Sequence, residues 1–191
     1  MTTMHRPRLS RIEADQATTV QREVMAELLA ARGKPGGRLA NLYAMMVRQP
    51  EMARLMGATG AYVRFHSSLP ELCREAAILA LCQAVGFDYE IAAHREIIVH
   101  RGLSPDQLVA LDEQRHDRLP RDLAAAAGFA VSASAGRAMP QGPWDEAVDV
   151  FGPEGALDLL LTCAHYTALA VVANVLLPEI DPPGHSLGKP A

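Results

Sequence analysis

Aromatic residues are scarce in this sequence, and the scarcity bears on the class of fold. Only 5% of the 191 residues are Phe, Trp or Tyr, although 49% are hydrophobic. Strands draw on aromatic and β-branched side chains, whereas this chain relies on Ala and Leu, which favour helices. We therefore expect an all-α protein, and the length suits a single domain with one hydrophobic core.

Cysteine is scarce as well. Cys73, Cys82 and Cys163 are odd in number and are not closely spaced. Cys73 and Cys82 are nine residues apart, so a helix turning about 100° per residue places them on opposite faces and prevents a disulfide between them. This usage is typical of a reducing compartment. The opening MTTMHRPRLS has no hydrophobic core of a signal peptide, so we expect a cytoplasmic protein.

An excess of positive charge is missing too. The formal net charge is −4 and no basic stripe is apparent, so we expect no binding to nucleic acid. The sequence contains no Gly-rich phosphate loop and no Gly-x-Ser-x-Gly elbow. The Glu-x-x-His motif that di-iron bundles use twice does not occur twice here, so we expect no metal site.

What the sequence does have is a central stretch, Leu69–Gly102, that predicts two helices joined at Gly86. The pattern Ser68-x-x-Glu71 predicts a capping box at the start of the first helix. Glu75 falls on the apolar stripe of that helix, where an unpaired carboxylate costs several kcal/mol. Glu75 therefore needs a buried partner or a function.

The second predicted helix begins at the N-cap candidate Asp88 and carries Glu90 and His94 on one face, four residues apart. If the two helices pack antiparallel, Glu75 meets His94 and raises the imidazole pKa against the opposite effect of burial. The second nitrogen of His94 then faces a cavity beside Glu90, which is the layout of a general acid/base. A buried pair with a purely structural role is the alternative.

Glu75, the pair Tyr89-Glu90 and His94, arranged around a hydrophobic helix and a Gly turn, resemble the carboxymuconolactone decarboxylase family. That family shares its fold with alkylhydroperoxidase D, and the resemblance is best over Asn41–Leu111. It implies a single-domain helical bundle of the alkylhydroperoxidase D-like type. It also implies a homotrimer or a hexamer of two trimers, and no organic cofactor.

The sequence departs from the peroxidase branch of this family, which carries Cys-x-x-Cys before the histidine. Phe87 and Glu90 occupy those two positions here, so a dithiol mechanism is not available. The resemblance to the decarboxylase branch implies a cofactor-free lyase acting on a small carboxylated lactone or aromatic-catabolism metabolite. In that reading His94 carries the proton, Glu75 orients it, and Glu90 assists proton transfer or binds substrate.

Four further residues are candidates for substrate binding. Tyr89 belongs to the motif, and Arg38 lies in a Gly-rich loop where it can bind a carboxylate. His165 and Tyr166 lie in the last long helix and can form a polar wall of the pocket. The structural alternatives are a solvated loop arginine for Arg38 and a core histidine bonded to backbone for His165.

Two other functions stay open at this point. One is an antioxidant peroxidase that uses a lone cysteine, Cys82 or Cys73, with an external thiol. The other is a non-enzymatic oligomeric or regulatory protein that keeps the family core.

The domain organisation follows from composition. We expect a flexible N-terminal arm over residues 1–17, a helical domain over 18–177 and a loose tail over 178–191, which is rich in Pro and Gly. Leu159–Leu177 is almost entirely apolar, and we expect it to be buried between subunits and not to span a membrane. The helix predicted over Glu51–His66 has an apolar stripe in which the methionines fill the core; its members are Met52, Leu55, Met56, Tyr62 and Phe65.

Overall fold

The computed structural model describes residues 6–34 and 36–187, and in this part of the chain every regular element is a helix. The prediction of an all-α, single-domain fold is confirmed. The elements in chain order are α1 (Thr19–Ala30), α2 (Asn41–Met46), α3 (Pro50–Phe65), α4 (Glu71–Val85), α5 (Asp88–His100), α6 (Pro105–Asp112), a 3₁₀ turn (His116–Arg118), α7 (Arg121–Ala133) and α8 (Gln141–Leu176).

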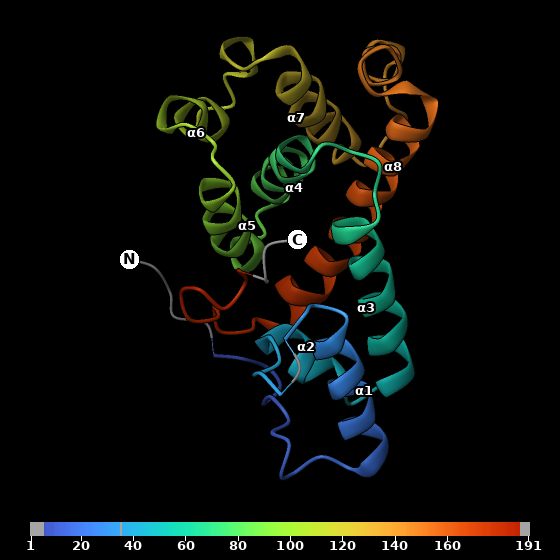
Figure 1. The fold of residues 1–191 in the computed structure, drawn as a ribbon, viewed down its shortest axis with the longest axis vertical. Coiled ribbons are helices and arrows are strands. Elements are labelled where there is room, and N and C mark those ends of the chain that lie inside the picture. Colours follow the sequence, from blue (N-terminus) through green and yellow to red (C-terminus); the bar gives the residue numbers. More distant parts are fainter. Residues whose placement is uncertain (1–5, 35, 188–191) are drawn as a thin grey trace.

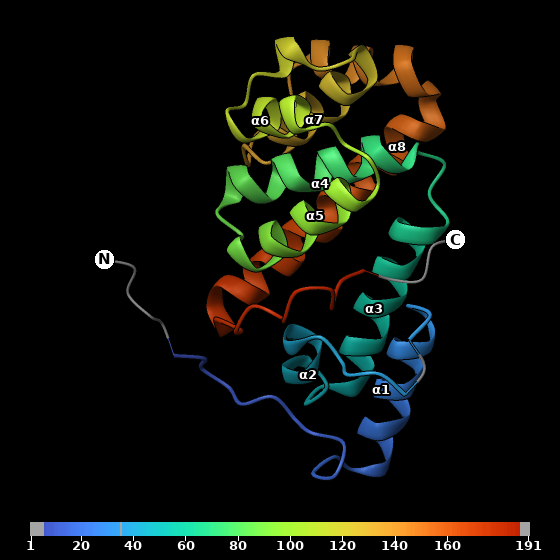
Figure 2. The ribbon, with the colours of Figure 1, turned by 60° about the vertical axis from the view of Figure 1, so that its left-hand side comes forward.

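Helix α4 is the centre of the fold, because α5, α7 and α8 all pack against it. Every residue from Cys73 to Cys82 is buried. Figures 1 and 2 show α4 to α7 at one end of the molecule and α1 to α3 at the other, with α8 running from the first end toward the second. A side chain on the inner faces of α4, α5 or α8 is therefore removed from bulk water.

Capping boxes begin two of the helices. Thr18 and Gln21 exchange bonds at the start of α1, as do Ser104 and Gln107 at the start of α6. The capping box predicted for Ser68 is wrong. The backbone N–H and the hydroxyl of Ser68 bond to the carboxylate of Asp158 on α8 instead, so the residue ties the α3–α4 loop to another helix.

The turn between α4 and α5 has the predicted stop. Gly86 has φ 65° and ψ 49°, the left-handed conformation in which a glycine ends a helix at little cost. Phe87 follows as the N-cap of α5 in place of the predicted Asp88, and its ring is fully buried. The chain reverses within two residues, and α5 returns along α4.

The predicted packing of α3 is wrong. Met52, Leu55, Tyr62 and Phe65 are exposed, and the face turned inward consists of Ala53, Gly57, Gly60 and Val63. These small residues recur at helical spacing and let α1 and α8 approach the backbone of α3 closely. Size, and not hydrophobicity alone, decides which face of this helix is buried.

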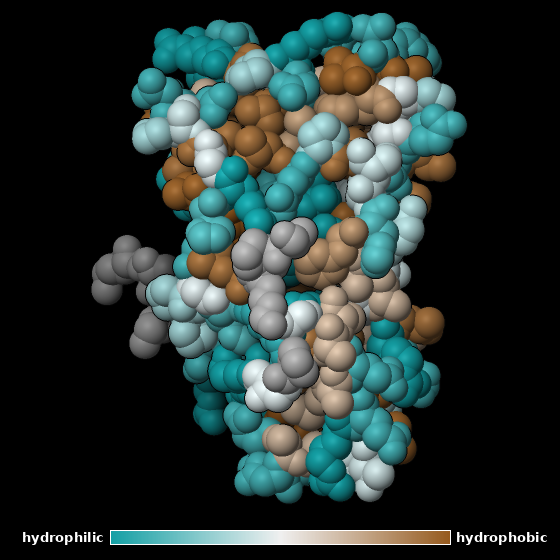
Figure 3. Space-filling model, viewed as in Figure 1, coloured by the Kyte–Doolittle hydropathy of each residue, from teal (hydrophilic) through white to brown (hydrophobic). Residues whose placement is uncertain are grey.

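Helix α8 is kinked at Gly152, which has φ 73°, and the part after the kink carries a buried face. By length and composition α8 could cross a bilayer, as could the core helix of many soluble proteins. Its outer face exposes Leu157, Leu161, Val171 and Val175, and hydrophobic residues also reach the surface in several places on the face shown in Figure 3. Coverage of this outer face by another subunit stays a prediction.

Both ends of the chain pack on the helices more than their composition suggests. In the arm, Ile12 and Ala17 are buried, and the N–H of Ile12 donates to the carbonyl of Ala44. Residues 178–187 cross between α5 and α3 in Figure 2, and the expectation of a loose tail leaves out the contacts that hold Asp181 there. The predictions for residues 1–5 and 188–191 fall outside the described residues.

Candidate active site

The return of α5 along α4 brings Glu75 and His94 together, as the sequence predicts. Nδ1–H of His94 donates to Oε2 of Glu75 over 2.6 Å, and each residue is only 1% exposed. The charge-assisted bond fixes the tautomer and the orientation of the ring, because Nδ1 must carry a proton to make it.

Glu90 connects this pair to the outside. Its Oε2 lies 3.1 Å from Nε2 of His94, one helical turn along α5. The sequence predicted that this nitrogen faces a cavity beside Glu90, but the structure places Glu90 between the ring and the cavity. Glu90 lines the cavity and His94 does not, so a proton on His94 reaches a ligand through Glu90.

Arg74 places a second positive charge beside Glu75, in addition to that of His94. Arg74 is buried, and one of its amino groups lies 3.5 Å from both Glu75 and Glu71. Glu71 is also paired with Arg101 at the end of α5. The carboxylate of Glu75 thus faces positive groups on two sides, which offsets the cost of burying it.

The electrostatics favour the ionised form of both members of the pair. Burial alone raises the pKa of Glu75, but the charge and the hydrogen bond of His94 outweigh it and hold the pKa below its ordinary value. Burial alone lowers the pKa of His94, but Glu75, and Glu90 after it, raise the pKa above its ordinary value. Both directions favour an ion pair between the carboxylate of Glu75 and the imidazolium of His94.

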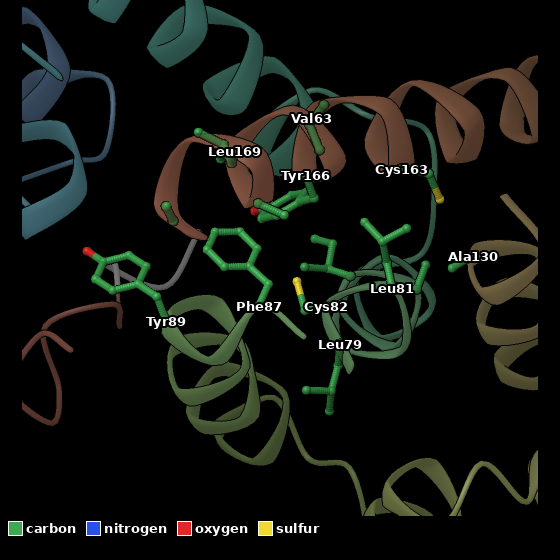
Figure 4. Close-up of a cluster of buried hydrophobic side chains, with 14 of the residues drawn as sticks. Val63, Leu79, Leu81, Cys82, Phe87, Tyr89, Ala130, Cys163, Tyr166 and Leu169 are labelled. Atoms are coloured by element: carbon green, nitrogen blue, oxygen red, sulfur yellow. The ribbon is translucent and has the colours of Figure 1, made fainter. Parts of the chain in front are cut away.

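Tyr166 stands between two imidazoles. Its ring meets His94 edge-on at 5.0 Å between centroids and meets His165 in the same manner at 5.3 Å. In Figure 4 Tyr166 projects from α8 toward α4 and α5, above Phe87 and Cys82. The predicted polar wall of His165 and Tyr166 is therefore present beside the Glu75–His94 pair.

The cavity beside Glu90 has a volume of about 70 Å³ open to the centres of water-sized molecules. That is several times the ~10–15 Å³ which one water needs on the same measure. It is walled by α2, α3, α5, α8, the loop before α2 and the C-terminal tail. The residues that line it include Arg32, Lys34, Arg38, Tyr43, Gly60, Arg64, Tyr89, Glu90, His165, Tyr166 and Asp181.

Arg38 and Tyr89 meet at the edge of this cavity on one carboxylate, that of Asp181. Nη1 of Arg38 lies 2.9 Å from Oδ1 of Asp181, and the hydroxyl of Tyr89 donates to Oδ2. The backbone N–H of Asn41 donates to both oxygens, at 3.1 and 3.2 Å. Arg38 can bind a carboxylate as predicted, but the carboxylate that it holds belongs to the tail.

Sequence reasoning missed five residues of the cavity. Arg32, Lys34 and Arg64 bring three cations to its wall, and none of them is ion-paired to a described residue. Burial, followed by the charge of Arg64, lowers the pKa of Lys34. Tyr43 and Gly60 also line the cavity, and the only signal for them was the pair of glycines at helical spacing in α3.

The three cysteines are buried and lie away from the cavity wall. Burial raises the pKa of Cys73 and of Cys163 to about 12, and raises that of Cys82 well above its ordinary value. A thiol in such surroundings is a poor nucleophile, because the thiolate is the reactive form.

Comparison with known proteins agrees with this architecture. Residues 50–135 match the profile of the Carboxymuconolactone decarboxylase family. The chain is similar in structure to the debrominase Bmp8, in a cysteine-to-alanine variant bound to 2,3,4-tribromopyrrole (TM-score 0.74, 18% identity, 93% of each chain covered). It is similar to apo Bmp8 as well (TM-score 0.72, 18% identity, 91% of this chain and 92% of that chain).

Among curated proteins, none matches the sequence significantly. The Bmp8 likeness, at 18% identity, concerns the fold. Residues 50–135 therefore match the carboxymuconolactone decarboxylase family, and the chain has the alkylhydroperoxidase D-like fold.

Proposed function

We propose that this protein is a cofactor-free acid/base enzyme, a lyase of the decarboxylase type, acting on a small carboxylated lactone or aromatic-catabolism metabolite. The family and the debrominase neighbours support an enzyme. One observation carries the proposal: the buried chain of Glu75, His94 and Glu90 ends at a cavity whose wall holds three cations that pair with no carboxylate of the described residues.

The cations support a negatively charged substrate. Arg32, Lys34 and Arg64 face the cavity without a described carboxylate partner, while Arg38 already has one in Asp181. Partly buried cations are stabilised by an anion more strongly than exposed ones, because solvent screens them less. One or two carboxylates on the substrate suit this wall.

The chemistry then follows from the order of the groups. When the substrate loses carbon dioxide, the electrons of the broken C–C bond move into a neighbouring carbonyl and form an enolate. His94 passes the proton of its Nε2 to Glu90, and Glu90, which borders the cavity, delivers that proton to carbon. Glu75 stays ionised and keeps His94 in place. Solvent returns the proton at the end of the cycle, so charge and protons balance.

Two alternatives fit the site less well. A lone-cysteine peroxidase needs a reactive thiol at the cavity, and Cys73, Cys82 and Cys163 are all buried with raised pKa values. A non-enzymatic protein needs no polar cavity beside His94, whereas Glu90, His165 and three cations border this one.

The test is turnover by the His94→Gln variant. Small carboxylated lactones are screened for release of carbon dioxide by the unaltered protein, and the best substrate is used for the variants. General acid/base assistance accounts for about 10²–10⁴-fold in rate, so His94→Gln should lose at least 100-fold in kcat while keeping its helical circular dichroism. A variant lacking all three cysteines serves as the control and should retain turnover. Full activity of a folded His94→Gln protein contradicts the proposal.

Self-association into a trimer or hexamer belongs to the same proposal. It is supported by the exposed hydrophobic side chains of α8, among them Leu157, Leu161 and Val171. Sedimentation as a monomer at micromolar concentration contradicts it.

A further inference from the structure

The wall of the cavity also holds two polar groups that the acid/base scheme does not use. Tyr43 on α2 is 5% exposed, and its hydroxyl forms no hydrogen bond of normal geometry with a described residue. The guanidinium of Arg32 lies close enough to influence the hydroxyl, but it can only donate to the oxygen and leaves the O–H of Tyr43 free to donate. Orphaned hydroxyls are uncommon in protein interiors, since each costs about 1–3 kcal/mol. Tyr43 lines the cavity, so a ligand can supply the missing partner.

His165 on α8 is the second group. It is 7% exposed and lines the cavity, and no described side chain or backbone group bonds to its ring nitrogens. Burial lowers the pKa of His165 to about 4, so the ring is neutral near pH 7. A neutral imidazole that carries its proton on the cavity side donates a hydrogen bond without adding a charge.

Gly60 is the reason that these two groups converge. A Cβ on residue 60 would stand 2.9 Å from Nε2 of His165 and 3.5 Å from the hydroxyl oxygen of Tyr43. Both atoms therefore lie around one point beside the backbone of α3, and any larger residue at position 60 would push the imidazole away. The guanidinium of Arg32 covers the ring of Tyr43, 4.3 Å from its centroid, and adds positive potential to the same wall.

We propose that Tyr43 and His165 form an oxyanion-binding subsite, which holds the carbonyl oxygen of the substrate and stabilises the enolate that develops on it. This assignment rests on the proposed acid/base function. Two donors aimed at the atom where negative charge appears, in a site with little water, provide the electrostatic stabilisation that such reactions need. Glu90 then works on carbon from α5 while Tyr43 and His165 work on oxygen from α2 and α8.

The subsite narrows the substrate class. The ligand must carry an oxygen acceptor conjugated to the reacting carbon, in addition to the carboxylate that the cations receive. A ketone, a lactone or an enol fits this description. A carboxylate without such an oxygen would contact the cations but not Tyr43 and His165.

The probe is 4-hydroxy-3-nitrobenzoate, whose coloured phenolate mimics an enolate and whose carboxylate suits the cations. 3-Nitrobenzoate, which lacks only the phenol, is the matched ligand. Binding of each is measured by absorbance or calorimetry at pH 7.5 for the unaltered protein, Tyr43→Phe, His165→Asn and Gly60→Ala. Tyr62→Phe, which changes an exposed tyrosine, is the control variant.

The expected result is a loss confined to the phenolate. A hydrogen bond to a charged acceptor changes affinity by about 10- to 100-fold, so Tyr43→Phe and His165→Asn should raise the Kd of the phenolate by that factor. Gly60→Ala should weaken it too, although it removes neither donor. The Kd of 3-nitrobenzoate should stay within about twofold throughout, which also shows that the variants are folded.

Equal losses for both probes overturn the proposal, and so does a phenolate Kd that Tyr43→Phe and His165→Asn leave unchanged. The test is separable from that of the acid/base function. His94→Gln should still bind the phenolate tightly, because His94 is not part of the subsite. If the unaltered protein binds the phenolate selectively but turns over no lactone, the proposed reaction class is contradicted and the subsite is retained.

Discussion

His94 and His165 pack edge-on against the same ring, that of Tyr166, and are both almost fully buried. Burial alone lowers the pKa of each imidazole, but the outcomes are opposite. Glu75 and Glu90 raise the pKa of His94 above its ordinary value, while His165 has no carboxylate bonded to it and its pKa falls to about 4. The comparison teaches that partners, and not depth, decide the charge of a buried histidine.

The two histidines also mark two sides of the site. The ionic wall is built by α4 and α5 and reaches the cavity at α5, where Glu90 lines it; its groups are satisfied by hydrogen bonds and suited to moving protons. The wall built by α2, α3 and α8 is neutral at its centre, has unsatisfied donors and is suited to receiving an oxygen atom. An acid/base enzyme needs both kinds of wall, since a proton moves at one atom while charge develops at another.

The largest expected effect on stability is that of Glu75→Ala, in the ionic wall. Removing one partner of a buried ion pair typically costs about 3–5 kcal/mol, because the other charge is left buried and unpaired. We expect a loss of that size in the free energy of unfolding at pH 6–7, measured by urea denaturation. Glu71→Ala removes an exposed carboxylate of the same network and should cost less than about 1 kcal/mol. Equal losses for the two substitutions would show that the buried Glu75–His94 bond stabilises the fold no more than an exposed ion pair does.

The stability contributed by His165 and by His94 should depend on pH in opposite ways. His165 has a folded-state pKa of about 4, below its ordinary 6.5, so its contribution to stability is present above pH 6.5 and is lost as pH falls toward 4. From pH 7 to pH 5 the unaltered protein should lose about 2 kcal/mol more than His165→Asn. Glu90 and Arg32 are the charges that act on His165.

His94 moves in the opposite sense. Its folded-state pKa is raised, so its contribution is complete below pH 6.5 and is lost only as pH rises through the folded-state value. It therefore cannot produce the acid loss assigned to His165. Unfolding curves at pH 7 and pH 5 for the two proteins give the difference, and equal slopes would argue against a neutral buried ring at position 165.

The smallest expected effect concerns the tail, which joins the two walls where Asp181 meets Tyr89 on α5 and Arg38 beside α2. Asp181→Asn should speed amide hydrogen exchange in residues 178–187 about tenfold, corresponding to ~1.4 kcal/mol of local contact energy. Global stability should hardly change. Glu179→Gln removes an exposed charge two residues away and should leave the exchange rates as they are. Unchanged exchange in Asp181→Asn would show that other contacts hold the tail.

The ionic wall could be predicted because its geometry is local. Glu90 and His94 are one helical turn apart. Gly86 ends α4 in a tight turn, so α5 returns along α4. A carboxylate on an apolar stripe and an imidazole on the facing helix then have to meet. The neutral wall could not be predicted in this way, since Tyr43, Gly60 and His165 come from three separate parts of the chain.

The error in α3 has the same origin. Its hydrophobic side chains suggested one buried face, but the fold buried the small residues around Gly60 instead. Ridges of large side chains would have kept α8 too far away for His165 to reach the cavity. Which face of an amphipathic helix is buried depends on the shape of its neighbours, and the sequence of that helix alone does not specify their shape.

By itself the sequence determined the helical class, the positions of the turns and the encounter of Glu75 with His94, because these follow from contacts between residues near one another along the chain. Only the tertiary structure decided that Glu90 separates His94 from the cavity, that three cations and an orphaned tyrosine border it, and that Asp181 holds the tail across its edge. Those features arise where distant segments meet, and the free energy of such meetings depends on the packing of the whole domain.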